Sequence, residues 1–385
     1  MTTEGSGRVL FVSPGPSIAD PESGEGARLH NLSRHLAEEW DVYTLVPEAV
    51  ADETPSWVRR QYTYSQWSMP FLTDLNPSFL RSVRHAISDA SIDVVHVSTG
   101  VCASRLVAVV GGDVAVVYAA QNVEADHAQD FVDPDLPAYK RLFGPRLIPL
   151  IERASVGCAA GITTVSEKDR GRFVERYGVD PGRIRAVPTG TESIDSDSLE
   201  DPTVVRDRYG LGDGPVAVFH GYYEHPPNRE AAELIDERIA PALRERGVDV
   251  EFLLVGKGAP DVSSPNVHAV GFVDDLYSVL GAADLAVVPI LHGGGTKTKV
   301  YDYVSLGLPI VATKKGLEGI DLEDGRHALV TAGVDEAFVE AVEEVVVDED
   351  LSSELTENLR RLAEEWSWDR SADRLEAFYR ELSPS

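Results

Sequence analysis

The chain alternates short runs rich in β-branched residues with longer amphipathic stretches, and this pattern most limits how its 385 residues can fold. Strands joined by helices of this length run parallel, because each helix carries the chain back across the sheet. The first half predicts six strands, over Arg8–Ser13, Asp41–Val46, Asp93–Ser98, Val114–Ala119, Gly161–Val165 and Ile184–Val187. Helices are expected between them over Ala27–Glu39, Pro77–Ser91, Arg141–Gly157 and Glu167–Tyr177. These elements fit one doubly wound sheet.

A second series of the same kind follows. Its predicted strands are Val216–Phe219, Glu251–Val255, Val267–Gly271, Leu285–Pro289, Ile310–Ala312 and Ala328–Val330. Its predicted helices are Asn228–Arg246, Thr298–Leu306 and Asp335–Val347. Since 385 residues also exceed the usual size of one core, we expect an α/β protein with two Rossmann-like doubly wound domains.

The domain boundary is expected where the sequence becomes rich in Ser, Asp, Glu and Gly. This gives an N-terminal domain over 1–192, a linker over 193–214 and a C-terminal domain over 215–366. Two further helices are predicted over Ser352–Trp366 and Arg370–Leu382, with Ser367 or Asp369 as the cap of the second. The break between them would let the last helix, 369–385, join the N-terminal domain.

The net charge of −29 is spread along the chain, which argues against nucleic-acid binding because a polyanion needs a basic face. Lysine is rare, at seven residues, so the surface is typical of proteins adapted to high salt, with an acidic mesophile as the alternative. Cys102 and Cys158 lack paired spacing, so neither a disulfide nor a zinc site is indicated. The apolar run Val9–Val12 is too short for a signal peptide or a membrane span. We expect a cytoplasmic protein, with peripheral contact at the inner face of the membrane as an open alternative.

The strongest local signal is a glycine-rich turn between the strand Leu285–Pro289 and a predicted helix. Glycines let backbone N–H groups approach a ligand, and the helix N-terminus adds a positive dipole end, so the turn predicts an anion site. Four of the seven lysines lie between positions 297 and 315. The residues expected to bind the donor here are His292, Gly293, Gly294, Gly295 and Thr296.

Three residues beside this turn are the predicted catalytic set: Lys297, Lys299 and Asp302. Lys299 and Asp302 are three residues apart, hence on one helix face, so an ammonium for phosphate and a carboxylate for ribose hydroxyls can meet one nucleotide. The alternative is a flexible turn with a solvated basic patch.

Further donor-binding candidates follow other strands of the second series. They are Gly221 and Asn228, Gly256 and Lys257, and Phe272 and Val273. Asn228 would cap a helix or donate to a phosphate, and the backbone near Val273 would read a base edge. Ordinary turn chemistry and a helix cap by Asp274 are the alternatives.

In the first half, a long glycine- and proline-rich loop would place Gly24, Gly26 and Arg28 toward the interdomain cleft. Gln121, Asn122 and Glu124 end another strand, and we expect all six residues on the acceptor side.

Five aromatic residues would form a lip for a lipid-linked or saccharide acceptor, or else pack in the core: Trp57, Tyr62, Tyr64, Trp67 and Phe71.

The sequence lacks the motifs that bind several classes of ligand. The sequence has neither a Walker loop nor a G-x-G-x-x-G after the first strand. An ATPase or a nicotinamide-dependent enzyme is therefore less well supported. The pairs Asp133/Asp135 and Asp195/Asp197 lie in a loop and in the expected linker, and we interpret them as solvated acids. No metal and no cofactor are therefore predicted.

The motifs together resemble the retaining GT-B glycosyltransferases of family 4, in the branch with a G-G-T-K-x-K donor loop. The resemblance runs nearly end to end, through the loop after the first strand, Asn122–Glu124, Ile162–Lys168, Val187–Gly190, Val255–Gly258, Gly271–Leu276, Ala283-Asp284, Gly293–Asp302, Gly307–Thr313 and Trp366–Trp368.

This resemblance implies a nucleotide-sugar held by the C-terminal domain, an acceptor held by the N-terminal domain, and a last helix that returns to the N-terminal domain. It implies no divalent metal, so Lys297 and Lys299 would meet the charge of the leaving diphosphate. The chain departs from the family pattern at several positions. Asp302 and Gly294 replace paired glutamates, Tyr222 a basic residue, Gln121 a histidine and Thr189 an asparagine, and a lysine usual in the family falls near Pro227-Asn228.

The predicted function is transfer of a sugar from a nucleotide-sugar to a lipid-linked or saccharide acceptor, in cell-surface glycan or glycoprotein glycan assembly. Two alternatives stay open. A non-hydrolysing sugar-nucleotide epimerase would share the fold but need no acceptor. A non-catalytic nucleotide-sugar-binding scaffold would bind without turnover.

Overall fold

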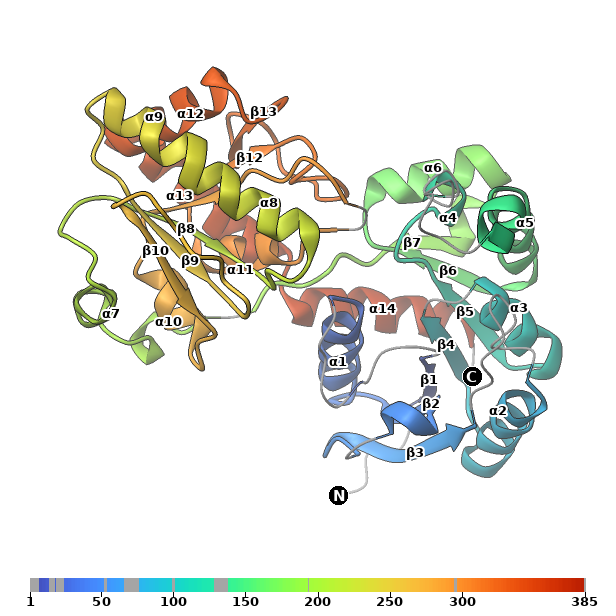
Figure 1. Ribbon diagram of the computed structural model, residues 1–385. Helices are drawn as coiled ribbons and strands as arrows, with labels where there is room; N and C mark the ends of the chain where they lie inside the picture. The colour runs from blue at the N-terminus through green and yellow to red at the C-terminus, as the bar shows by residue number, and fades with distance from the viewer. Residues whose placement is uncertain are drawn as a thin grey trace. The chain divides into compact units, whose positions relative to one another are not determined.

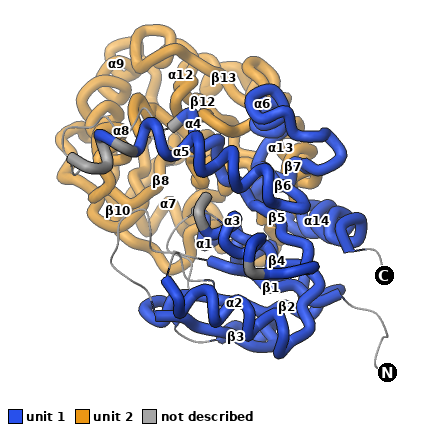
Figure 2. The backbone as a smooth tube through the Cα atoms, turned by 90° about the vertical axis from the view of Figure 1, so that its right-hand side faces the viewer, with its two compact units in different colours: residues 1–190, 368–385 blue, residues 191–367 orange. Residues whose placement is uncertain are grey.

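The computed structural model describes residues 7–13, 18, 24–51, 54–65, 76–98, 101–127, 138–192, 194–293 and 296–383. The chain forms two compact units, shown in Figures 1 and 2. The first unit comprises residues 1–190 and 368–385, and the second comprises residues 191–367.

The first unit is built on a seven-stranded parallel sheet in the order β3-β2-β1-β4-β5-β6-β7. Its strands are β1 (Arg8–Val12), β2 (Asp41–Pro47), β3 (Val58–Tyr64), β4 (Val94–Ser98), β5 (Ala115–Ala119), β6 (Gly161–Thr164) and β7 (Ile184–Ala186). Six of them match the predicted ranges to within one residue at each end. The strand order reverses between β1 and β4, as in doubly wound folds.

Strand β3 was not predicted, and it accounts for part of the aromatic stretch. Tyr62 and Tyr64 are buried on one face of this edge strand, whereas Arg59 and Thr63 are exposed. Core packing therefore holds for the two tyrosines, and they form no lip for an acceptor. Trp67 and Phe71 lie outside the described residues.

Helices cover both faces of this sheet (Figure 1). They are α1 (Gly24–Leu36), α2 (Pro77–Ala90), α3 (Val101–Val110), α4 (Glu124–His127), α5 (Ala138–Cys158), α6 (Glu167–Tyr177) and α14 (Trp368–Leu382). Of these, α3 and α4 were not predicted. Side-chain caps fix two of the predicted starts, since Asn76 accepts from the first turn of α2 and Ser166 from that of α6.

Successive side chains of β1 point to opposite faces of the sheet and so belong to two different parts of the hydrophobic core of the first unit. Val9 and Phe11 point to the face covered by α1 and α14, and Leu10 and Val12 to the face covered by α2 and α3. The last helix thus packs beside α1, at the opposite end of the sequence. Ser367 directly precedes α14, and Asp369 lies in its first turn with Oδ1 2.6 Å from His35 Nδ1.

The second unit holds a six-stranded parallel sheet in the order β10-β9-β8-β11-β12-β13. All six strands were predicted: β8 (Val216–His220), β9 (Glu251–Val255), β10 (Val267–Gly271), β11 (Leu285–Val288), β12 (Ile310–Thr313) and β13 (Ala328–Thr331). The helices are α7 (Pro202–Tyr209), α8 (Pro226–Leu234), α9 (Ala240–Glu245), α10 (Leu276–Gly281), α11 (Lys299–Leu306), α12 (Glu336–Val347) and α13 (Glu349–Glu365). The helix predicted over Asn228–Arg246 is continuous through a π-helical turn, Ile235–Ile239.

The segment 193–214, expected as a linker, instead lies within the second unit. It contains α7, which Asp201 caps and whose Val205 is fully buried. Arg206 donates to the carbonyl of Ala282 and to Asp284, which fixes the helix against the sheet. A short helix with one apolar anchor has the same polar composition as a linker, so composition did not separate the two.

Candidate anion site at the carboxyl edge of the second sheet

The candidate site lies where β8 and β9 end and where the loop after β11 leads into α11. In the strand order of this sheet, the direction of winding reverses between β8 and β11. Ligands of open α/β sheets bind outside the carboxyl ends of the strands at such a reversal. The residues that follow these strands include Gly221, Gly256 and Gly293, which are three of the predicted donor-binding residues.

Two glycines let the backbones after β8 and β9 pass in close contact. Gly256 has a φ of +133°, and a Cβ there would lie 2.0 Å from the carbonyl oxygen of Gly221. A Cβ at Gly221 would lie 2.9 Å from Lys299 Nζ and 2.9 Å from Asn228 Nδ2. Glycine at both positions therefore leaves room for polar side chains that converge on the strand ends.

We expect Gly256→Ala to destabilise the second unit by about 2 kcal/mol or more, because alanine adds both an unfavourable φ and a contact with Gly221. Thermal unfolding measures the loss. Gly212→Ala is the matched control, since its φ is not in the left-handed region and a Cβ there would meet its nearest neighbour at 3.9 Å. Equal melting temperatures for the two variants would contradict the close approach.

Lys299 provides a buried ammonium group at this site. It begins α11, is only 8% exposed, and donates from Nζ to Asn228 Oδ1 at 2.6 Å. Its Nζ also lies 4.0 Å from the centre of the Phe219 ring, a cation–π contact. Asn228 Nδ2 in turn donates to the carbonyl of Tyr222, which fixes the amide. An ammonium donates three hydrogen bonds, so Lys299 keeps donor capacity for an anion.

The electrostatic state of the lysines fits an anion site. Burial, followed by the charge of Lys297, lowers the pKa of Lys299 to about 7, while Asp302 acts in the opposite direction. Burial and the charge of Lys315 also lower the pKa of Lys297, which is half-buried. Two ammonium groups that are partly desolvated and near each other gain stability when an anion binds between or beside them.

Asp302 is held in place by two side chains that sequence reasoning missed. Tyr277 of α10 donates its hydroxyl to Asp302 Oδ1 at 2.9 Å. His220 Nε2, at the end of β8, lies 3.2 Å from Asp302 Oδ2. Tyr303 binds the other side of the imidazole, since its hydroxyl accepts from the backbone N–H of His220 at 3.0 Å and lies 3.0 Å from Nδ1.

This network fixes the tautomer of His220. The carboxylate of Asp302 only accepts, so the hydrogen of the neutral imidazole lies on Nε2 and faces Asp302, and Nδ1 accepts from the Tyr303 hydroxyl. Each carboxylate oxygen of Asp302 thus receives one donor and keeps a lone pair. With 27% of its side chain exposed, Asp302 can accept hydrogen bonds from a ligand's hydroxyl groups.

The other predicted donor-binding residues are less enclosed. Phe272 is 74% exposed and Val273 half-buried, and Asp275, not Asp274, caps α10 by accepting from Ser278 N. Asn228 is not a helix cap either, because α8 begins at Pro226 and His225 takes the cap position.

Around the glycine-rich turn, Lys257 is exposed, with Nζ 6.0 Å from the Tyr222 ring centre. His292 is exposed, and its Nε2 lies 3.7 Å from Glu230 Oε1. Gly293 has a φ of +95°, Thr296 is half-buried, and Gly294 and Gly295 lie outside the described residues.

In the first unit, Arg28, predicted on the acceptor side, is buried at the start of α1. It is 5% exposed and donates to the carbonyl of Val187 and, at 3.3 Å, to Thr189 Oγ1. These contacts join α1 to the segment that follows β7, and the acceptor-side role of Arg28 stays a prediction. Gly24 and Gly26 lie in the first turn of α1, where the predicted helix had not yet begun.

Gln121, Asn122 and Glu124 follow β5 and are half-buried. A buried carboxylate that the sequence did not reveal anchors this segment: Glu152 of α5 accepts from the backbone N–H groups of Glu124 and Ala125 at 2.9 and 3.0 Å. It also accepts from the Tyr177 hydroxyl. Burial raises the pKa of Glu152, and these three donors offset the cost of burying its charge.

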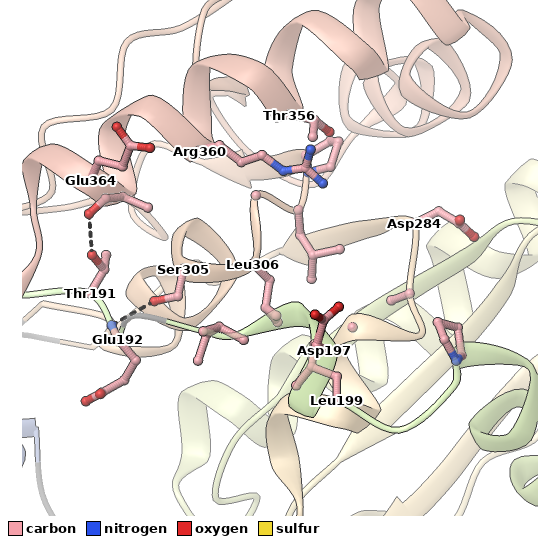
Figure 3. Close-up of a pocket in the computed structure, with 18 of the residues that line it drawn as sticks. Thr191, Glu192, Asp197, Leu199, Asp284, Ser305, Leu306, Thr356, Arg360 and Glu364 are labelled. Atoms are coloured by element: carbon pink, nitrogen blue, oxygen red, sulfur yellow. Dashed lines mark hydrogen bonds between the residues drawn. The ribbon is translucent and has the colours of Figure 1, made fainter.

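A larger open pocket of about 900 Å³ lies at the other edge of the second sheet (Figure 3). Its lining includes Asp284 and Pro309, which directly precede β11 and β12, together with Thr191 and Arg360. Two of its acidic side chains already form ion pairs, Asp284 with Arg206 and Glu200 with Arg208. Because ligands of such sheets bind at the carboxyl edge, we assign the site to Lys299 and its neighbours rather than to this pocket.

Two doubly wound units, with a glycine-lined lysine at the carboxyl edge of the second, fit the two-domain GT-B fold. Comparison with protein families agrees. Residues 23–193 match the model of Glycosyltransferase Family 4, and residues 214–348 match that of Glycosyl transferases group 1. Together the two matches span more than three quarters of the chain, so that each half of the chain matches a glycosyltransferase domain.

Solved structures share the fold. Anabaena HepE in complex with UDP superposes with a TM-score of 0.69 at 13% identity, over 96% of this chain and 98% of that one. Sucrose-phosphate synthase from Thermosynechococcus elongatus gives 0.69 at 17% identity, over 98% and 99%. At such identities the likeness shows a common GT-B fold.

Curated relatives are also glycosyltransferases. D-inositol 3-phosphate glycosyltransferase of Geodermatophilus obscurus is 29% identical over 61% of this chain and 55% of its own length. A GDP-mannose-dependent phosphatidylinositol monomannoside mannosyltransferase of Mycolicibacterium smegmatis is 29% identical over 56% and 60%. The matches thus span little more than half the length of these relatives. Within the described ranges, the chain has no helix long and apolar enough to cross a membrane.

Proposed function

We propose that this chain transfers a glycosyl group from a nucleotide-sugar, bound at the carboxyl edge of the second sheet, to a saccharide or lipid-linked acceptor held by the first unit. The observation that carries the proposal is Lys299, a buried ammonium group set among glycines at a strand-order reversal. The names of the relatives support the acceptor class, since one acts on an inositol phosphate and another on a phosphatidylinositol monomannoside.

In the proposed reaction, the bond between the sugar's anomeric carbon and the diphosphate oxygen breaks, and a bond to an acceptor hydroxyl oxygen forms. Negative charge develops on the leaving diphosphate, and Lys299 and Lys297 stabilise it. Attack from the face that the diphosphate leaves would retain the anomeric configuration and let a phosphate oxygen take the hydroxyl proton. The two lysines supply the positive charge that a divalent ion supplies in other phosphate sites, which supports a metal-independent reaction.

Acceptor-dependent release of nucleoside diphosphate tests the proposal. Purified protein is incubated with a panel of nucleotide-sugars, with and without inositol phosphates, simple saccharides and lipid-linked saccharides. Transfer predicts release that requires both substrates. Interconversion of the sugar without an acceptor would favour an epimerase, and nucleotide binding without release under any condition would favour a scaffold.

Tyr277→Phe is expected to weaken binding of the cognate nucleoside diphosphate about fivefold, because Asp302 loses one of the two donors that orient it toward the ribose. Calorimetry with the ribonucleotide and its 2′,3′-dideoxy analogue measures this. The dideoxy form should bind wild type and variant equally, since it has no hydroxyls for Asp302. Tyr209→Phe, a half-buried tyrosine of α7, is the control. A similar loss with both nucleotides would assign Tyr277 to packing alone.

A further inference from the structure

Asn228 is the hydrogen-bond partner of the buried lysine at the anion site, and it carries no charge. Lys299 Nζ donates to Asn228 Oδ1 at 2.6 Å. Within the described ranges, Lys299 forms no ion pair with a carboxylate, although about one residue in six of the whole sequence is acidic. By contrast, the exposed Lys315 pairs with Glu318 at 2.6 Å. The buried ammonium group of Lys299 is thus held by a partner that does not neutralise it.

The amide of Asn228 has one orientation, and it serves the lysine rather than its own helix. The carbonyl of Tyr222 only accepts, so the amide nitrogen faces it, at 2.9 Å, and the amide oxygen faces the ammonium group. Asparagine at the start of a helix usually caps the free N–H groups of the first turn. Asn228 is instead the third residue of α8, and its amide links the loop after β8 to the first residue of α11.

The other neighbours of the Lys299 ammonium group enclose it without pairing with it. The centre of the Phe219 ring lies 4.0 Å from Nζ, and a Cβ at Gly221 would lie 2.9 Å from it. The charged groups that act on Lys299 are Lys297, which lowers its pKa, and Asp302, which raises it. Both carboxylate oxygens of Asp302 already accept from other side chains. Asn228 is therefore the side chain that fixes where the ammonium group lies.

We propose that Asn228 is a positioning residue, which holds the ammonium group of Lys299 at the strand ends without neutralising it and so leaves that charge for the diphosphate. This inference rests on the proposed function, in which a nucleotide-sugar binds at this edge. An aspartate of the same shape would also hold the ammonium group, but its carboxylate would neutralise Lys299 and repel the diphosphate. An apolar residue would remove the acceptor and favour loss of the proton. A neutral acceptor avoids both effects.

The first test is the titration of Lys299 in the full chain without ligand, followed by NMR of lysines labelled with carbon-13 at Cε. The chain has seven lysines, and the signal that is missing from Lys299→Met identifies Lys299. Asn228→Asp should raise the midpoint of this titration by about one pH unit or more, and Asn228→Leu should lower it. A residue that only packs would not move the midpoint in opposite directions. Unchanged midpoints, or midpoints that move the same way in both variants, would overturn the proposal.

The second test is calorimetry with UDP and GDP. At pH 7, Asn228→Asp should weaken binding of whichever nucleotide the wild type binds by about tenfold or more, because a negative charge then faces the diphosphate. The affinity of Asn228→Leu should begin to fall at a lower pH than that of the wild type. Asn358→Asp and Asn358→Leu are the matched controls, since the amide of Asn358 in α13 donates to the carbonyl of Arg326 at 3.0 Å. Both controls should leave the affinity and its pH dependence unchanged.

The two tests separate failure of this inference from failure of the proposed function. If Asn228→Asp bound the nucleotide as tightly as the wild type does, the proposed donor site would stand and Asn228 would be assigned to packing. If neither nucleotide bound to the wild type, the donor site would be contradicted, whereas the Lys299 midpoints would still decide whether Asn228 controls the charge of the lysine. Thermal unfolding of each variant shows that it is folded.

Discussion

Lys299→Met is expected to weaken binding of the cognate nucleoside diphosphate by about a hundredfold or more at pH 7. Methionine keeps an unbranched side chain of similar length against Phe219 but removes the ammonium that donates to Asn228. Loss of one partner from a buried, charge-assisted interaction costs about 2–5 kcal/mol, and the lower end of that range is already about thirtyfold in affinity. Turnover should fall at least as much, because the charge on the diphosphate increases as the glycosidic bond breaks.

The lowered pKa of Lys299 leads to a prediction of how nucleotide binding varies with pH. The pKa of Lys299 is about 7 without ligand, and a bound anion raises it, so binding takes up a proton above pH 7. Affinity of the wild type should therefore fall as pH rises from 7.5 to 9.5, where the diphosphate itself no longer titrates. The affinity of Lys299→Met should be nearly constant over this range. Calorimetry in buffers of different ionisation enthalpy counts the protons taken up.

A lysine far from the strand ends provides the control for both measurements. Lys168→Met removes an exposed ammonium from α6 and should leave nucleotide affinity and its pH dependence unchanged. If Lys299→Met bound the nucleotide as wild type does while remaining folded, the anion site would not be at Lys299. The transferase proposal would then lose the observation that carries it.

The sequence predicted the sheets well because each buried strand carries its own signal. A run such as Val9-Leu10-Phe11-Val12 is apolar on both faces, as a central parallel strand requires. Strand β3 was missed because it lies at the sheet edge, where two arginines and a glutamine precede Tyr62 and Tyr64. Its aromatic residues then resembled a surface cluster as much as a strand.

In the candidate site too, the sequence revealed the residues that are close together along the chain and missed the contacts between distant ones. The glycines and lysines near position 297 are close in the sequence, so their pattern indicated an anion site. The partners of Asp302 are not: Tyr277 is 25 residues away and His220 is 82 residues away. Only the pairing of β8 with β11, and the packing of α10 on α11, brings these side chains together.

Arg28 shows another long-range feature that the sequence did not reveal. Its place after a glycine-rich loop favoured a role on the acceptor side, because loops on rigid sheets often carry function. In the structure its partners, Val187 and Thr189, lie 159 and 161 residues away. Buried arginine is rare without partners, and the sequence offered no sign that carbonyl and hydroxyl oxygens would be within its reach.

Trp368→Ala is expected to destabilise the first unit by about 3–5 kcal/mol, the usual cost of removing a large buried aromatic side chain. Trp368 begins α14, is 5% exposed, and lies so close to Gly190 that a Cβ there would be 2.2 Å from its ring. It belongs to the same core cluster as Phe11 of β1 and Leu29 of α1. Its loss should loosen the last helix from the unit that the first strand and helix form.

Trp366→Ala is the matched control, because the two tryptophans are two residues apart but belong to different units. Trp366 is half-buried, and its ring centre lies 5.5 Å from that of Tyr301 in α11. Hydrogen exchange followed by mass spectrometry separates the two effects. Trp368→Ala should speed exchange in peptides from β1, α1 and α14, and Trp366→Ala in peptides from α11 and α13. If both variants loosened the same peptides, the chain would not change units between these two residues, and α14 would have to be reassigned to the unit of the anion site.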